Sequence, residues 1–140
     1  MSRVFWDTNL FIYLFEDYGP WSKITAGLRE RMLERGDQLL TSTLTLGEIL
    51  VKPMELGDVA LSGKYEDALK RSALLVPFDV KAAKTYGSLR SDRSLRAPDA
   101  IQLACAASAG VDLFVTNDAR LQGKHVAGIQ FIVPLDRAPI

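Results

Sequence analysis

The sequence predicts an α/β fold in which a mostly parallel five-stranded sheet is covered by helices on both faces. Short apolar runs, typical of strands buried on both faces, alternate along the chain with longer segments of helical periodicity. Strands that alternate with helices of ten or more residues favour right-handed crossovers between parallel strands. The 140 residues, of which 48% are hydrophobic, are sufficient for one such unit, and we expect a single domain over residues 1–140.

Five apolar runs, each beside polar residues, Gly or Pro, are the expected strands. They cover residues 4–6, 39–40, 74–76, 113–115 and 131–133. The spacing of apolar residues between these runs predicts helices over residues 21–33, 44–51, 61–73, 79–91 and 98–109. The longest apolar run, residues 10–15, is expected to contribute to the core and is assigned to no element.

The composition excludes several classes of protein. A single cysteine allows no intramolecular disulfide and no Cys-based metal cluster. The six-residue apolar run is far shorter than the roughly 18 residues of a membrane span, and no signal peptide is recognisable, so we expect a cytoplasmic protein without membrane contact. The 17 basic and 17 acidic residues give no overall basic character of the kind that marks many nucleic-acid-binding proteins.

Four acidic residues are the candidates for a functional site. Asp7 ends the first strand and Asp118 follows the fourth, so both are expected at the edge of the sheet where ligands bind in parallel α/β folds. Asp99 follows Pro98 in the first turn of its helix, and Glu48 lies in the apolar helix after the second strand.

Each acid also has an ordinary structural interpretation. Asp7 is equally consistent with a helix N-cap, and an acid in the first turn, such as Asp99, is favoured by the helix dipole. Asp118 is suited to capping a short helix from about Ala119, and Glu48 to a half-exposed position.

Taken together, the four acids indicate a metal site. Clustered carboxylates raise one another's pKa unless a cation neutralises them. Oxygen ligands without supporting His or Cys favour Mg²⁺ or Mn²⁺ over zinc, and Mg²⁺ commonly binds through a few carboxylates and a substrate phosphate. The chemistry this predicts is phosphoryl transfer with a metal-activated water.

Four segments resemble the PIN-domain nucleases, and among them the VapC-type toxins of type II toxin-antitoxin pairs. The segments are Val-Phe-Trp-Asp-Thr-Asn at 4–9, Thr-Leu-Gly-Glu-Ile at 45–49, Ala-Pro-Asp-Ala-Ile-Gln-Leu-Ala at 97–104 and Val-Thr-Asn-Asp-Ala-Arg-Leu at 115–121. Their order and spacing, in a chain of this length, carry the resemblance.

The resemblance implies a three-layer α/β/α sandwich and a Mg²⁺- or Mn²⁺-dependent endoribonuclease, a hydrolase of phosphodiester bonds. It implies a catalytic, metal-binding site formed by Asp7, Glu48, Asp99 and Asp118. Asn9 and Thr116 match polar positions that support the carboxylates or approach the scissile phosphate. The resemblance also implies a homodimer, a structured RNA target such as tRNA, and a cognate antitoxin whose tail occupies the site. For that antitoxin, a groove at Tyr18, Trp21 and residues 50–56 is one candidate surface.

Other functions remain open at this stage. A PIN nuclease that processes RNA without being a toxin has the same motifs, and a binding module that has lost its chemistry is disfavoured by the four intact acids. A haloacid-dehalogenase-type phosphohydrolase needs an Asp two residues after the first, where this chain has Asn9. A receiver domain needs a paired acid after the first strand and a Lys after the last, neither of which is recognisable.

Basic residues near two of the acids are candidates for holding RNA phosphates, with a solvated basic surface as the alternative. They are Arg90, Arg93, Arg96, Arg120 and Lys124. Setting the four site acids aside leaves 17 basic against 13 acidic residues, so the neutral chain is expected to have an acidic pocket in a modestly basic surface.

Overall fold

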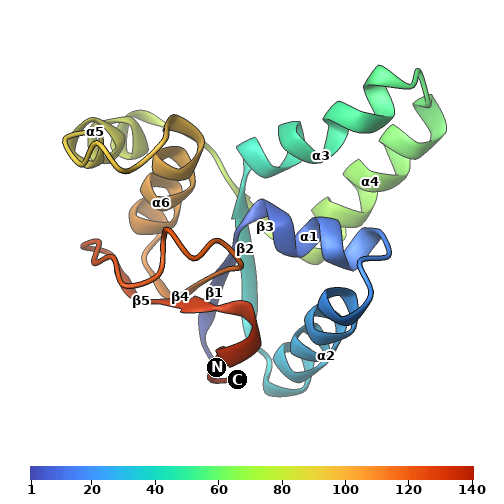
Figure 1. The fold of residues 1–140 in the computed structure, drawn as a ribbon, viewed down its shortest axis with the longest axis horizontal. Coiled ribbons are helices and arrows are strands. Elements are labelled where there is room, and N and C mark those ends of the chain that lie inside the picture. The colour runs from blue at the N-terminus through green and yellow to red at the C-terminus, as the bar shows by residue number, and fades with distance from the viewer.

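The computed structural model describes residues 1–140 and contains the predicted five-stranded sheet, in which all neighbouring strands are parallel (Figure 1). The strands are β1 (Arg3–Trp6), β2 (Gln38–Ser42), β3 (Leu74–Val76), β4 (Val111–Thr116) and β5 (Ile129–Pro134). Their order across the sheet is β3-β2-β1-β4-β5. The chain therefore winds from β1 outward to β3 and then returns to the other side of β1. The carboxyl ends of β1 and β4 lie where this winding reverses, which is the usual ligand position in open parallel sheets.

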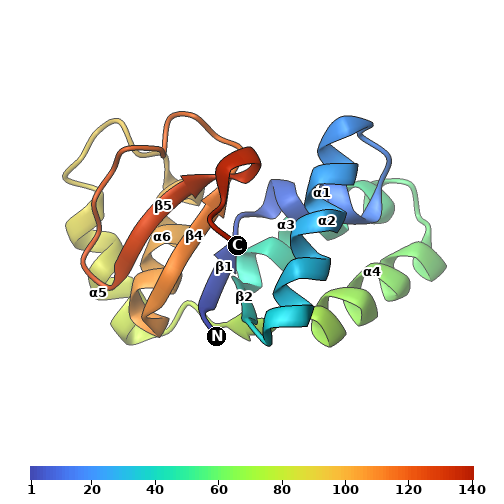
Figure 2. The same ribbon diagram turned by 90° about the horizontal axis from the view of Figure 1, so that it is seen from below.

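Helices cover both faces of the sheet, as Figures 1 and 2 show, so the predicted three-layer sandwich is confirmed. The helices are α1 (Thr8–Phe15), α2 (Pro20–Arg35), α3 (Thr43–Glu55), α4 (Val59–Ser72), α5 (Val80–Leu89) and α6 (Ala97–Ala109), followed after β5 by a 3₁₀ turn, η1 (Leu135–Arg137). The pair α5 and α6 packs on one face, while α1 to α4 pack on the other.

The strands are buried on both faces because their side chains point alternately to the two helical layers. Phe5 of β1 stacks on Phe114 of β4, with ring centroids 5.2 Å apart, beneath α5 and α6. Its neighbours Val4 and Trp6 point the other way and pack with Leu28 of α2. All five residues have no exposed surface.

The predicted helices are present, with boundaries that differ by a few residues: most begin earlier or end later, whereas α5 is shorter than predicted. Gly36, at φ 72°, terminates α2, and Asp79 caps α5 by accepting a hydrogen bond from the Ala82 amide at 3.0 Å. The short helix considered after Asp118 is absent, because residues 119–123 form turns. Leu33 of α2 is 62% exposed, so it lies outside the buried stripe of that helix.

Helix α1 is the element that the sequence does not reveal. It occupies the apolar run at residues 10–15, where unbroken hydrophobicity hides any helical period. Leu10 and Phe11 are fully buried, and Asp7 caps the helix by accepting from the Thr8 amide at 2.9 Å. None of the helices has the length and apolar character needed to cross a membrane.

Candidate active site at the carboxyl end of the sheet

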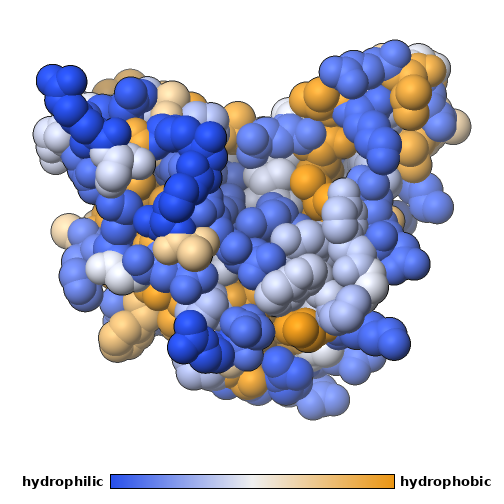
Figure 3. Space-filling view, viewed as in Figure 1, coloured by the Kyte–Doolittle hydropathy of each residue, from blue (hydrophilic) through white to orange (hydrophobic).

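The four candidate acids line one pocket of about 460 Å³ at the carboxyl end of the sheet. Asp7 directly follows β1, Asp118 follows β4, Glu48 lies in α3, and Asp99 lies in the first turn of α6. Four elements that are distant in sequence therefore contribute to the same site. In Figure 3, hydrophilic side chains surround the hollow between the α6 side and the α3 side of the molecule.

Asp7 is the most buried of these acids, with 9% of the residue exposed. Its Oδ2 accepts from the Thr116 hydroxyl at 2.7 Å, and its Oδ1 accepts from the Thr8 amide at 2.9 Å. Burial raises the pKa of Asp7 to about 6, and the charges of Asp99 and Glu48 add to the rise against these two hydrogen bonds. Asp7 is thus both the N-cap of α1 and a buried pocket acid with a raised pKa. The capping role and the site role expected from the sequence are therefore compatible.

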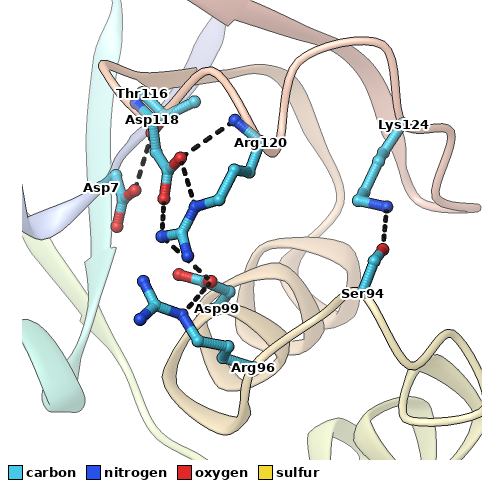
Figure 4. A network of polar contacts seen from close by, with 8 residues as sticks. All are labelled: Asp7, Ser94, Arg96, Asp99, Thr116, Asp118, Arg120 and Lys124. Carbon is cyan, nitrogen blue, oxygen red and sulfur yellow. Dashed lines mark hydrogen bonds and ion pairs between the residues drawn. The ribbon is translucent and has the colours of Figure 1, made fainter.

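Asp99 and Asp118 face two arginines across the pocket (Figure 4). Arg120 forms a two-pronged ion pair with Asp118, in which its Nε lies 2.9 Å from Oδ1, and its guanidinium also lies 3.9 Å from Asp99. The Nε of Arg96 lies 3.8 Å from the same Asp99 oxygen. The Arg120 hydrogen bond lowers the pKa of Asp118. The arginines supply the positive charge that clustered carboxylates need.

Glu48 is exposed, although the helix around it is apolar in sequence. Its Oε1 accepts a hydrogen bond from the Thr8 hydroxyl at 2.6 Å, which ties α3 to the first residue of α1. Asn9 also lines the pocket, and its Oδ1 is buried without a hydrogen-bond partner. An unpaired buried acceptor in an acidic pocket is a free ligand for a cation.

The donor set of the pocket fits a hard divalent cation, because every candidate ligand is an oxygen. As the side chains stand, however, no three His, Cys, Asp or Glu residues are grouped closely enough to hold an ion. Asp118 is turned to Arg120, so cation binding at this acid requires that ion pair to open. The oxygen ligands therefore suit Mg²⁺ or Mn²⁺, but Arg120 occupies the Asp118 carboxylate in this arrangement.

The five basic residues expected near RNA divide into two groups. Arg96 and Arg120 line the pocket. Outside it, Arg90 donates to the Tyr86 hydroxyl at 2.9 Å, and Lys124 pairs with Asp92 at 2.9 Å.

Arg93, the fifth basic residue, is exposed outside the pocket. Lys124 also lies 2.8 Å from the Ser94 hydroxyl (Figure 4). Hydrogen bonds from Ser94 and the Lys124 pair lower the pKa of Asp92 to about 2.

Two polar pocket residues, Thr8 and Gln102, are absent from the set predicted by sequence, as are the apolar Ile12 and Pro98. Gln102 is 2% exposed and lies one helical turn after Asp99 on α6. A neutral amide within an otherwise apolar helix, three residues from a candidate acid, is the signal that could have identified it. Thr8 has no comparable signal, because a Thr at the start of a helix is common.

Comparisons with known proteins agree with this architecture. The sequence profile described as PIN domain matches residues 4–126. No curated protein matches the chain significantly in sequence. The fold is similar to a chain of VapBC2 from Rickettsia felis bound to a DNA fragment from its promoter, with a TM-score of 0.75 and 14% identity over 94% of this chain and 98% of that one.

Two further solved structures are similar in fold. A chain of DNA-bound VapBC from Salmonella typhimurium gives a TM-score of 0.71 at 19% identity, covering 96% of this chain and 99% of that one. A chain of a toxin-antitoxin complex from Klebsiella pneumoniae gives 0.64 at 22% identity, covering 90% and 94%. Because the profile covers most of the sequence and the fold agrees, the chain belongs to the PIN domain family.

Proposed function

We propose that the protein is a metal-dependent endoribonuclease and the toxin of a toxin-antitoxin pair. One observation carries the nuclease proposal. A single pocket is lined by Asp7, Glu48, Asp99 and Asp118, and it lies where the strand order of this PIN-family sheet reverses. Phosphoryl transfer is the chemistry for which a carboxylate pocket with flanking arginines is suited.

The four acids and Asn9 Oδ1 are the proposed ligands of Mg²⁺ or Mn²⁺. A divalent ion bound there supplies a Lewis acid that activates water and stabilises charge on the phosphate. Thr116 and the Thr8 amide hold the Asp7 carboxylate in one orientation. Little side-chain reorganisation is then needed at Asp7 when the charge in the pocket changes.

The arginines of the pocket are the proposed substrate-binding groups. Arg96 and Arg120 each contact acids of the pocket and are more than half exposed, so their guanidinium groups are available to a phosphate from solvent. Guanidinium forks bind phosphate oxygens in pairs. Arg90, Arg93 and Lys124 extend the basic surface outside the pocket and are proposed to contact RNA farther from the cleaved bond.

The toxin assignment rests on the kind of complex formed by proteins of similar fold, which are VapBC and toxin-antitoxin assemblies. An exposed apolar surface near the end of α3 supports a partner of this kind: Val51, Met54 and Leu56 are 54%, 63% and 69% exposed. We propose that the antitoxin covers this surface, called here the α3 apolar surface. A homodimer and a tRNA target stay predictions.

Cleavage of RNA by the purified protein tests the nuclease proposal. We expect cleavage with Mg²⁺ or Mn²⁺, none after EDTA, and a loss of at least about 100-fold in Asp7→Asn and Asp99→Asn, since each removes a charged ligand. A panel of RNAs is assayed with each metal after any copurifying antitoxin has been removed. Undiminished cleavage by a folded Asp99→Asn variant contradicts the site.

Expression in a host cell tests the toxin proposal separately. We expect growth arrest, relief of the arrest when the adjacent reading frame is co-expressed, and no arrest with Asp99→Asn. Harmless expression of an active nuclease, together with no binding by the neighbouring product, would leave an RNA-processing enzyme instead.

A further inference from the structure

A buried polar cluster lies beneath the pocket, between α6, α1, α3 and β2. Gln102 is at its centre, and its Nε2 donates to the Thr8 hydroxyl at 2.9 Å and to the Thr45 hydroxyl at 2.8 Å. Its Oε1 accepts from the Ser42 hydroxyl. All four residues are less than 9% exposed, so water does not replace these bonds. A buried amide with both N–H groups and its carbonyl satisfied is held in one orientation.

The direction of each hydroxyl in this cluster follows from counting protons. Thr8 and Thr45 both accept from Gln102, so each has one proton left to donate. The Thr41 hydroxyl donates to the Trp6 carbonyl at 2.8 Å, which leaves its oxygen as the acceptor for Thr45 at 2.8 Å. The Thr8 hydroxyl lies 2.6 Å from Glu48 Oε1 and 3.1 Å from the Thr45 hydroxyl, and we assign its proton to the nearer carboxylate oxygen.

We propose that Gln102 is a positioning residue that, through Thr8, holds Glu48 over the acid pocket. Glu48 is the exposed member of the four acids, and no arginine of the pocket pairs with it. The Thr8 hydroxyl is thus the group that restrains a long, flexible side chain on the open side of the site. The inference extends the proposed function, because Glu48 matters as a proposed ligand.

Thr45 provides a matched control for Thr8. Both are buried threonines that accept from Gln102, yet only Thr8 donates to Glu48. Replacing either by the isosteric valine removes one hydroxyl and leaves one Gln102 N–H without its partner, and each variant also loses one further contact, to Glu48 from Thr8 or to Thr41 from Thr45. A greater loss of metal affinity in Thr8→Val than in Thr45→Val therefore reports on the contact between Thr8 and Glu48.

Titration of the metal-free protein with Mn²⁺ by calorimetry measures the effect directly. Groups that orient a metal ligand typically change affinity by about 10- to 100-fold, so we expect at least about tenfold weaker binding in Thr8→Val. Thr45→Val is expected to stay within about twofold, and Thr8→Ser to restore affinity, because it returns the hydroxyl. Gln102→Leu is expected to weaken binding, and the double variant with Thr8→Val no further, since both act through one hydroxyl.

Equal weakening by Thr8→Val and Thr45→Val, or additive losses from Thr8→Val and Gln102→Leu, overturns the inference. A second measurement is independent of metal and of nuclease activity. The side-chain amide of Gln102 in ¹⁵N spectra is expected to exchange slowly and to shift in Glu48→Gln, because the two groups are joined through Thr8. An unshifted Gln102 amide overturns the inference even if RNA is cleaved, whereas a shifted amide in a protein without nuclease activity refutes only the proposed function.

Discussion

Asp7 combines two demands on one side chain, since it caps α1 and carries a charge in the most buried corner of the pocket. The cap needs the carboxylate oxygen, but burial without a cation disfavours the ionised form. Burial accordingly raises the pKa of Asp7 to about 6 in the metal-free protein. A bound cation would relieve this conflict.

The stability of the metal-free protein is therefore expected to depend on pH through Asp7. The folded state retains this proton up to about pH 6, whereas the unfolded chain loses it near the ordinary value of 3.8, so the free energy of unfolding falls as the pH rises between these values. The shift corresponds to about 3 kcal/mol. Urea unfolding in EDTA should show wild type losing stability relative to Asp7→Asn over this range. A difference that is independent of pH contradicts the assignment.

Arg120 competes with any cation for Asp118 and Asp99, so its removal should tighten metal binding. Exposed ion pairs are weak, so we expect a gain of at most about fivefold in Mn²⁺ affinity for Arg120→Gln. Arg93→Gln is the control, because Arg93 is exposed and forms no ion pair. Calorimetric titration with Mn²⁺ measures the affinity of both variants. Weaker Mn²⁺ binding in Arg120→Gln would contradict competition between Arg120 and the cation.

The sequence predicts the acids of the site better than their partners. Asp7 and Asp118 follow apolar runs, and such positions meet at one edge of a parallel sheet. The pairing of Arg120 with Asp118 depends on the turn that replaces the expected helix, and the linkage from Gln102 to Glu48 crosses three helices. Contacts of this kind depend on tertiary packing, which local periodicity does not encode.

At the scale of elements, the strands and the amphipathic helices were predictable because each has a distinct period, while α1 was not. A helix that is apolar on most sides has no stripe to detect. The connection between β4 and β5 is likewise set by packing. Gly128, at φ 98°, brings the chain against α6, where an added Cβ would lie 2.5 Å from the Ala107 carbonyl oxygen.

We therefore expect Gly128→Ala to be more destabilising than Gly123→Ala. Both glycines have positive φ, so both replacements incur backbone strain of about 1–2 kcal/mol. At Gly128 the added Cβ also collides with the backbone of α6, which should lower the free energy of unfolding by about 1–3 kcal/mol more. At Gly123 nothing lies within 4 Å of an added Cβ. Equal losses in urea unfolding would show that α6 yields to the added methyl.

For the whole molecule, the net charge of zero combines an acidic pocket with a surplus of basic residues elsewhere. That surplus is smaller than the sequence analysis predicts. Two of the 17 basic residues lie in the pocket with the four acids, which leaves 15 basic and 13 acidic residues elsewhere. Arg96 and Arg120 thus reduce the negative charge of the pocket. That residues 1–140 act as one domain stays a prediction.

The α3 apolar surface lies outside the pocket, so the proposed antitoxin contact can be tested separately from the proposed catalysis. A Met54→Lys and Leu56→Glu double variant should lose at least about tenfold in antitoxin affinity, since burying two charges is unfavourable. RNA cleavage by the free protein should be unchanged. Pull-down and titration with the product of the adjacent reading frame measure the first effect. Unaltered binding would place the antitoxin on another surface.

The order of the strands has a consequence for synthesis on the ribosome. β1 emerges first but lies at the centre of the sheet, and its β4 edge stays unpaired until residue 116 has been made. A nascent chain that ends after β3 contains Asp7 and Glu48 but neither Asp99 nor Asp118. The pocket therefore cannot assemble before residue 118 has been synthesised, so a shorter nascent chain lacks part of the proposed site.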